Sequence, residues 1–560
     1  MARQEKPIRP RGRMQHLGHS WGMRSPAFPF TPPAAGPKLP QRFRGYATDG
    51  PPESPRTSRV RPPVSRNQQP TVALVSLGCP KNLVDSERML AVLALGGFAV
   101  TTDPDGADVA VVNTCAFIDL ARAESDQHLD ELESLKRHGR LGRVVVAGCM
   151  VQRYGRQILR RHPGVDAIVG VADREALADV CRQVLKDAGG AGPGRHGGSA
   201  HRKARDGRHG SKGRRGDAGA SPDPIVCVGM HLATPPDDRE RLRLTPRHYA
   251  YLRVSEGCDN RCAYCAIPEI RGPLRSKPPE LILAEAHELV ADGAQELILI
   301  GQDTTAYGRD FAPGVAPDAK PWTLGRLVAT LREEVSATWI RLMYAHPASF
   351  ADDVIEQLAA GLPVVPYVDL PLQHANDAIL ASMGRRVGRA EIERLIARLR
   401  QAAPGVAIRT SFIVGYPGET DEQFEELAEF VRKVRFDQVG VFVYSAETGT
   451  RAADLPDPVP HDVARRRWER LMELAEGLGH EAALERRGQA LAVLVDGADA
   501  SGRLIARHAG QAPEVDSVTL LPPGAAEVGR MVTVRVTGAE GYDLVAEVVP
   551  GRSAGRTTNG

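Results

Sequence analysis

Short apolar segments alternate with longer amphipathic stretches along most of this 560-residue chain, and this alternation limits the possible folds more than any other feature. Strands that alternate with helices form parallel sheets covered on both faces. The expected strands of the first array, each followed by a helix, are Val72–Leu77, Ala107–Val112, Arg143–Ala147 and Ala167–Val169. Residues 71–186 are therefore predicted to form an α/β domain with a Rossmann-like parallel sheet.

A second array of the same kind follows. Its expected strands are Tyr249–Val254, Glu296–Ile300, Trp339–Tyr344, Tyr367–Leu370, Ile408–Val414 and Val439–Tyr444. Six strand–helix units are too few to close an eight-stranded barrel. We therefore expect residues 225–487 to form a partial (βα)6 barrel.

From Gly488 onward the pattern changes to short apolar runs separated by Gly, Pro and Asp turns, which predicts a small antiparallel β-barrel over residues 488–550. This segment holds 8 Asp/Glu and 4 Arg, and Tyr542 is its only aromatic residue. RNA-binding barrels usually present a basic groove and stacking rings. The acidic composition instead fits a basic protein partner. Residues 551–560 are predicted to be a disordered tail.

The net charge of +3 conceals two basic segments. Residues 1–70 hold 14 Pro and 13 Lys/Arg against 3 Asp/Glu, which predicts a disordered extension. Residues 187–224 hold 11 Gly and a net charge of +4, which predicts a flexible basic linker. The rest of the chain carries −11, so overall charge does not indicate nucleic-acid binding. RNA contact through the linker stays open as an alternative to a simple spacer.

The composition also limits the compartment. The longest apolar stretch, Met89 to Val100, spans about 12 residues, well short of the roughly 20 needed to cross a bilayer. No apolar segment of the signal-peptide kind follows the first basic residues. Eight Cys in 560 residues are too sparse for a disulfide scaffold. We expect a cytoplasmic enzyme that makes no membrane contact.

Three cysteines lie at equivalent positions in the first array. Cys79, Cys115 and Cys149 each follow an apolar strand directly, and a helix follows each in turn. Parallel strands end at the same rim of a sheet, where open α/β sheets bind ligands, and helix N-termini favour thiolates. The pattern predicts a metal or cluster site. The alternative is simple packing, which we expect for Cys181 and Cys227.

A second trio follows the first strand of the partial barrel, where Cys258, Cys262 and Cys265 form a C-x3-C-x2-C motif. Three thiolates can hold three irons of a cubane cluster and leave the fourth iron open, whereas iron–sulfur sites usually take four Cys. Zinc is the alternative, but structural zinc sites close with a fourth ligand, and no partner Cys or His follows nearby. The spacing favours an iron–sulfur cluster that can chelate an exogenous amino acid.

With this motif in a six-unit barrel, the chain resembles the radical S-adenosylmethionine (SAM) enzymes. The N-terminal trio and the small C-terminal barrel, which is then TRAM-like, narrow the resemblance to the methylthiotransferases. Three stretches are similar to the branch that acts on the small-subunit ribosomal protein uS12 (S12): Gly78–Glu87 (GCPKNLVDSE), Pro371–His374 (PLQH) and Ala512–Asp516 (APEVD). The transfer-RNA branch typically has Gln-Met in place of Pro80-Lys81.

The resemblance implies methylthiolation of the β-carbon of an aspartate in uS12. It implies two 4Fe-4S clusters, one on each trio, with S-adenosyl-L-methionine as radical precursor and methyl donor. It also implies an electron donor such as a flavodoxin or ferredoxin. Two other functions stay open: a transfer-RNA methylthiotransferase that acts on a modified adenosine, and a zinc-stabilised RNA- or ribosome-binding module without catalysis.

Six further residues are candidates at strand ends. Gln302 and Asp303 follow the second barrel strand, where family members place polar groups around the methionine end of the cofactor. Ile413 and Gly415 end the fifth strand, and their backbone is expected to line the adenine. Gln373 and His374 end the fourth strand and are substrate-side candidates, although His374 fits a buried loop histidine equally well.

Overall fold

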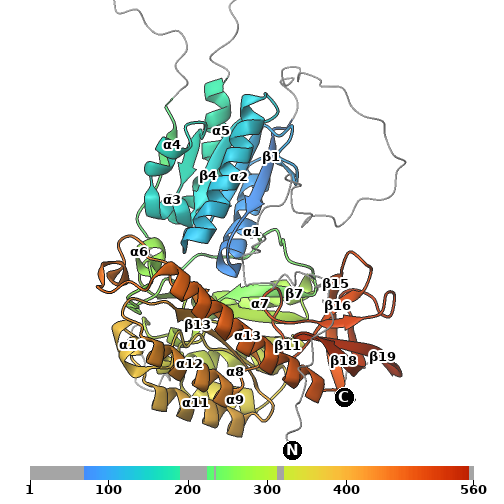
Figure 1. Ribbon diagram of the computed structural model, residues 1–560. Helices are drawn as coiled ribbons and strands as arrows, with labels where there is room; N and C mark the ends of the chain where they lie inside the picture. The colour runs from blue at the N-terminus through green and yellow to red at the C-terminus, as the bar shows by residue number, and fades with distance from the viewer. Residues whose placement is uncertain (1–68, 189–222, 232–234, 312–320, 554–560) are drawn as a thin grey trace, which may run out of the picture.

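A computed structural model describes residues 69–188, 223–231, 235–311 and 321–553. Nearly all of the predicted extension (1–70), linker (187–224) and tail (551–560) lies outside the described residues. Figure 1 shows three units: an N-terminal α/β domain, a partial barrel on which it sits, and a small β-barrel at the side of the partial barrel. No helix in the described part of the chain is long and apolar enough to cross a membrane.

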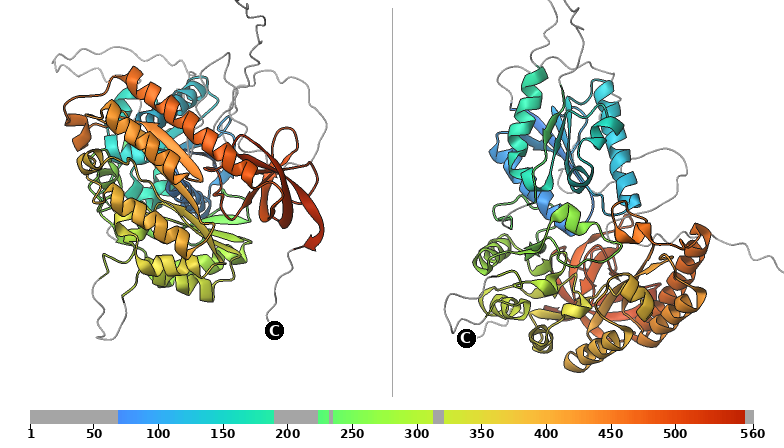
Figure 2. Two further views of the ribbon diagram at one scale, coloured as in Figure 1. Left: turned by 60° about the horizontal axis from the view of Figure 1, so that its bottom comes forward. Right: turned by 90° about the vertical axis from the view of Figure 1, so that its left-hand side faces the viewer.

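The N-terminal domain is a six-stranded parallel sheet in the order β2-β1-β3-β4-β5-β6. Helices cover both of its faces (Figure 2, right), and apolar clusters lie on each side of the buried strands. The strands are β1 (Thr71–Ser76), β2 (Ala99–Thr101), β3 (Val109–Thr114), β4 (Arg143–Gly148), β5 (Ala167–Val169) and β6 (Ile225–Cys227). The helices are α1 (Pro80–Leu95), α2 (Asp119–Arg137), α3 (Cys149–Tyr154), α4 (Gln157–Arg161) and α5 (Leu177–Ala188), with a 3-10 turn at Val171–Ala176.

Two strands of this sheet differ from the sequence prediction. The short strand β2 was not predicted, because three half-exposed residues show no periodicity. Strand β6 was assigned to the second unit, but it pairs in parallel with β5 and completes the N-terminal sheet. Only a long-range pairing decides this, since the local sequence of β6 fits either unit.

The second unit is an open six-stranded parallel sheet in the order β14-β13-β12-β11-β10-β7, which confirms the partial barrel. Its strands are β7 (Tyr249–Arg253), β10 (Glu296–Ile300), β11 (Trp339–Leu342), β12 (Val364–Asp369), β13 (Ala407–Val414) and β14 (Gln438–Val443). Its long helices are α7 (Pro279–Ala291), α8 (Leu324–Glu334), α9 (Asp352–Ala359), α11 (Arg389–Ala402), α12 (Asp421–Val434) and α13 (His461–Glu485). Short elements are α6 (Ile267–Arg271), α10 (Asp377–Ser382), 3-10 turns at Thr304–Ala306, Pro347–Ser349 and Arg451–Asp454, and a ribbon of β8 (Ser255–Glu256) and β9 (Arg275–Ser276).

The C-terminal unit is a closed five-stranded barrel in the order β15-β16-β17-β19-β18, as predicted. One pair, β17–β19, is parallel, whereas the other four are antiparallel. The strands are β15 (Ala490–Ala498), β16 (Leu504–His508), β17 (Thr519–Leu521), β18 (Met531–Glu540) and β19 (Asp543–Ser553).

The inner face of the partial barrel is where the three units meet. An apolar cluster on this face joins side chains of β7, β10 and β11 to Val84 of α1 and to Leu494 and Ala512 of the C-terminal unit. The stretch Ala512–Asp516 makes polar contacts there as well, because the Tyr249 hydroxyl donates to Glu514 at 3.1 Å and Asp516 pairs with Arg409 at 3.2 Å. The small barrel is thus held on the sheet by buried polar contacts.

Candidate functional site: two cysteine trios

The first trio gathers at the carboxyl ends of three N-terminal strands, as predicted. Cys79 precedes α1, Cys115 follows β3, and Cys149 begins α3. The three thiols interact electrostatically, and Cys115 and Cys149 are buried while Cys79 is half-buried. Gly78 allows this approach, because its φ is +92° and a Cβ there would lie 2.8 Å from the Cβ of Cys115. A side chain at position 78 would push the loops of Cys79 and Cys115 apart.

Burial, rather than the helix N-termini, dominates the charge state of these thiols. Burial raises the pKa of Cys149 to about 11 despite the nearby guanidinium of Arg271, and it raises the pKa of Cys115 further above the ordinary range. At Cys115 and Cys149, burial thus outweighs any preference for the thiolate that the helix N-termini give. Buried thiols of this kind lose their protons when a metal supplies the compensating charge.

The second trio lies in the loop between β8 and β9. The Cys258 N–H donates to the Gly272 carbonyl at 3.0 Å, and the Cys265 N–H donates to the Cys262 carbonyl at 3.2 Å. Burial raises the pKa of Cys258 to about 11 and that of Cys265 to about 12. Arg385 lies beside this trio, with Nη1 3.9 Å from Cys262 Sγ.

The spacing of the thiols fits clusters better than single metal ions. Within the described residues, neither trio brings all three sulfur atoms within 4.8 Å of one another. A tetrahedral zinc site with Zn–S bonds of about 2.3 Å would need S···S separations of roughly 3.8 Å. Three thiols that are buried or half-buried and more widely separated suit a cubane cluster with one open corner.

Arg271 connects the two trios. It ends α6, six residues after Cys265, and its side chain is fully buried. Its Nη2 lies 3.1 Å from Cys149 Sγ and 3.3 Å from Asn82 Oδ1, and its Nη1 donates to Asp85 at 2.8 Å. The segment that carries the second trio therefore reaches the first trio through this guanidinium.

Arg271 belongs to a buried ion network of five acidic and five basic side chains that no local sequence pattern indicated. Asp85 contacts three guanidinium groups, and its α1 neighbour Glu87 pairs with Arg241 at 2.8 Å. The network joins the N-terminal domain to β7 and α7 of the partial barrel. Its members are Asp85, Glu87, Asp238, Glu256 and Glu285 with Arg174, Arg241, Arg253, Arg271 and Lys277.

Gln302 and Asp303 lie beside the second trio, as predicted. The Gln302 amide donates to Glu256 at 2.7 Å, and its own carbonyl oxygen is buried without a hydrogen-bond partner among the described residues. Asp303 accepts a 2.6 Å hydrogen bond from Asn260, which lies between Cys258 and Cys262. Burial is the main cause of the raised pKa of Cys258, and the negative charge of Asp303 raises this pKa further.

His374 and Gln373 lie at the end of the fourth barrel strand, and contacts within the protein hold both of them. His374 is completely buried: its Nδ1 accepts from the Asn376 N–H at 3.0 Å and its Nε2 lies 3.2 Å from Glu419. The substrate-side interpretation of His374 is therefore corrected to that of a satisfied loop histidine. Gln373 has a φ of +73° and uses its backbone N–H and C=O to pair with the strand β13.

Ile413 and Gly415 are held by the backbone and by packing. The Ile413 N–H donates to Gln373, and its half-buried side chain packs beside Tyr416 and Met383. The Gly415 N–H donates a hydrogen bond to the carboxylate of Glu419. Gly415 has a φ of +75°, and a Cβ there would lie 2.3 Å from the Cβ of Ala464 in α13. This glycine is thus required by the approach of α13.

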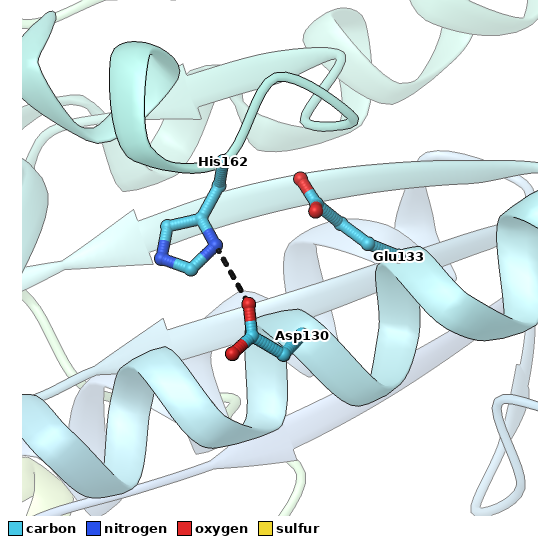
Figure 3. A group of neighbouring side chains, drawn as sticks. All are labelled: Asp130, Glu133 and His162. Carbon is cyan, nitrogen blue, oxygen red and sulfur yellow. Dashed lines mark ion pairs between the residues drawn. The ribbon is translucent and has the colours of Figure 1, made fainter.

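A third polar cluster lies on the N-terminal domain away from both trios (Figure 3). Asp130 and Glu133 of α2 lie near His162, with their ligand atoms within 4.8 Å of one another. His162 is bonded to Asp126 at 3.0 Å and lies 3.4 Å from Asp130, while Glu133 accepts the Gly164 N–H at 2.8 Å. These contacts tie α2 to the loop after α4, and we assign the cluster a structural role.

Three family models match the three units in order. Residues 71–170 match the Uncharacterized protein family UPF0004, residues 252–431 match the Radical SAM superfamily, and residues 488–549 match the TRAM domain.

Curated relatives cover nearly the whole described chain. The chain is 42% identical over 480 residues to "Ribosomal protein uS12 methylthiotransferase RimO" of Anaeromyxobacter sp. (strain Fw109-5), covering 85% of this chain and 93% of that protein. The proteins of that name from Trichlorobacter lovleyi and Myxococcus xanthus are 39% and 40% identical and are covered to 98% and 91%, each over 85% of this chain. The chain belongs to the RimO family of radical SAM methylthiotransferases. The resemblance inferred from the RimO-like motifs is thereby confirmed.

Among solved structures, the chain is similar to the radical S-adenosylmethionine methyltransferase TsrM from Kitasatospora setae. The TM-score is 0.44 at 15% identity, with 67% of this chain and 72% of that chain covered.

Proposed function

We propose that this RimO-family chain methylthiolates the β-carbon of an aspartate in ribosomal protein uS12, with two 4Fe-4S clusters and S-adenosyl-L-methionine. The observation that carries the proposal is the pair of cysteine trios at strand ends, since Arg271, six residues after the second trio, contacts Cys149 of the first. The names of relatives about 40% identical over most of the chain supply the substrate. The transfer-RNA alternative is not favoured, because these relatives are uS12 methylthiotransferases by name and the C-terminal barrel is acidic.

In this proposal Cys258, Cys262 and Cys265 hold one cluster, and Cys79, Cys115 and Cys149 hold the other. When bound, the clusters and S-adenosyl-L-methionine supply the radical that activates an unreactive C–H bond and the sulfur and methyl groups that replace its hydrogen. Gln302 and Asp303 are proposed to orient the bound cofactor from the rim of β10, since Gln302 retains a buried unpartnered carbonyl oxygen.

The backbone near Ile413 and Gln373 is proposed to line the same mouth, because both lie at the carboxyl end of the sheet. The small ribosomal subunit is the proposed partner, with a flavodoxin or ferredoxin as electron donor and the cytoplasm as the site of reaction.

Single cysteine variants test the assignment. After anaerobic reconstitution, the wild type should hold about eight irons per chain and add one methylthio group to uS12, as seen by mass spectrometry. Cys262→Ala should abolish cleavage of S-adenosyl-L-methionine and keep about four irons. Cys115→Ala should keep cleavage but lose methylthiolation. The matched control is Cys227→Ala, since Cys227 lies on β6 outside both trios.

Retained methylthiolation in either trio variant would refute the assigned role of that trio. A wild-type chain that modifies transfer RNA and leaves uS12 unchanged would refute the proposed substrate.

A further inference from the structure

Lys81 is a buried basic residue that does not belong to the buried ion network. It occupies the first turn of α1, two residues after Cys79, and only 8% of it is exposed. Its Nζ lies 3.3 Å from the centroid of the Tyr344 ring. Among the residues that the structure describes, no carboxylate lies within 4 Å of this ammonium group.

The basic members of the ion network around Asp85 are all paired with carboxylates. Arg271 contacts Asp85 and Glu256, and Lys277 contacts Asp238 and Glu285. Asp369 and Glu256 are the carboxylates whose charges act most strongly on Lys81, and each already pairs with an arginine. Asp369 accepts from Arg409 at 2.8 Å, and Glu256 accepts from Arg253 at 2.6 Å.

Tyr344 is the residue whose ring contacts the Lys81 ammonium group. It follows β11 and has a φ of +61°, a strained conformation for a bulky residue that is typical of functional sites. Its ring lies under the ammonium group of Lys81, and its surroundings include Cys79 and Asp369. An aromatic face stabilises a cation but does not replace a counter-ion.

Within the described residues no carboxylate lies within 4 Å of this buried lysine, which sits beside the cluster ligand Cys79 and is suited to bind an anionic group of the substrate. The aspartate of the proposed function carries such a group one bond away from the carbon that is modified. We propose that Lys81 binds the carboxylate of the substrate aspartate and so holds its β-carbon between the two cysteine trios. This inference rests on the proposed function, because it needs an acidic side chain as substrate.

The test compares two substrates on the reconstituted holoenzyme: uS12, and uS12 with its target aspartate replaced by asparagine. Affinity is measured without reductant by fluorescence anisotropy of labelled uS12, and kcat/KM is measured with reductant. Wild type should bind the aspartate form more tightly than the asparagine form. Lys81→Met should weaken binding of the aspartate form about 30-fold and leave the asparagine form unchanged.

Controls separate this role from a structural one. Lys433→Met, on the exposed side of α12, should bind both forms like wild type. The electron paramagnetic resonance spectra and iron content of Lys81→Met should match wild type. If that variant loses iron, Lys81→Arg keeps the positive charge and should keep the preference for the aspartate form.

Equal weakening of both substrate forms in Lys81→Met would overturn the inference, and so would loss of the preference in an iron-replete Lys81→Arg. These results differ from a failure of the proposed function, in which the wild type itself would leave uS12 unmodified.

Discussion

At the scale of single residues, buried charges fix the position of the N-terminal trio relative to the partial barrel. Burial alone would raise the pKa of Asp85, but Arg253, Arg271 and Arg174 outweigh it and lower the pKa to about 2. Because the same carboxylate contacts all three guanidinium groups, it positions Arg271 beside Cys149.

We expect Asp85→Asn to lower the free energy of unfolding at neutral pH by about 3–5 kcal/mol, since it leaves buried guanidinium groups short of a counter-charge. The folded pKa of Asp85 is depressed, so its contribution is complete above the unfolded pKa of about 3.9 and is lost as the pH falls toward 2. The deficit of the variant should therefore narrow below about pH 4, as measured by urea unfolding across a pH series.

Asp179→Asn is the control, because its pair with Arg182 is exposed and should contribute less than about 1 kcal/mol. A deficit for Asp85→Asn that stays constant down to about pH 2 would contradict the role of its ionised form.

At the level of secondary-structure elements, the packing of α13 against the loop after β13 requires a glycine at position 415. Gly415 and Gly418 both have positive φ, of +75° and +79°. A Cβ at Gly415 would collide with Ala464 of α13, whereas a Cβ at Gly418 would meet nothing within 4 Å. The two positions share the backbone strain and differ only in the contact with α13.

Gly418→Ala should therefore cost about 1–2 kcal/mol of unfolding free energy through left-handed strain alone. Gly415→Ala should cost about 1–3 kcal/mol more, because α13 must shift. Thermal or urea unfolding of the two variants measures the difference. Equal losses of unfolding free energy in the two variants would contradict this prediction, because they would show that α13 shifts without destabilising the protein.

At the scale of the whole molecule, the N-terminal domain is also fixed to the barrel at a second place. Glu447, in the segment after β14, pairs with Arg122 of α2 and with Arg153 of α3, and its side chain is 2% exposed. Together with the ion network around Asp85, this contact holds the N-terminal domain against the partial barrel.

Glu447→Gln should lower the melting temperature and reduce methylthiolation more than cleavage of S-adenosyl-L-methionine, because cleavage needs only the barrel trio whereas transfer needs both. The loss of stability should be about 3 kcal/mol for a buried pair. Glu175→Gln removes the exposed pair with Arg88 and should change neither readout measurably. A variant of Glu447 in which cleavage and transfer fall equally would contradict a docking role.

Much of the fold could be predicted because its signals are local. Strands such as Glu296–Ile300 have the predicted bounds, because apolar periodicity acts over a few residues. The grouping of Cys79, Cys115 and Cys149 also followed, since parallel strands end at one rim. The choice between the two interpretations of His374 could not be made from the sequence, because its partner Glu419 is 45 residues away.

The two βα arrays, the small barrel and the two cysteine trios after strands can be read from the chain alone, because apolar periodicity and the rules of parallel sheets act along the chain. Three features depend on the folded structure: β6 joins the first sheet, Arg271 reaches Cys149, and Lys81 lies over Tyr344 with no carboxylate within 4 Å among the described residues. These contacts join residues from separate units, so they depend on how the units dock, and no local pattern contains that information.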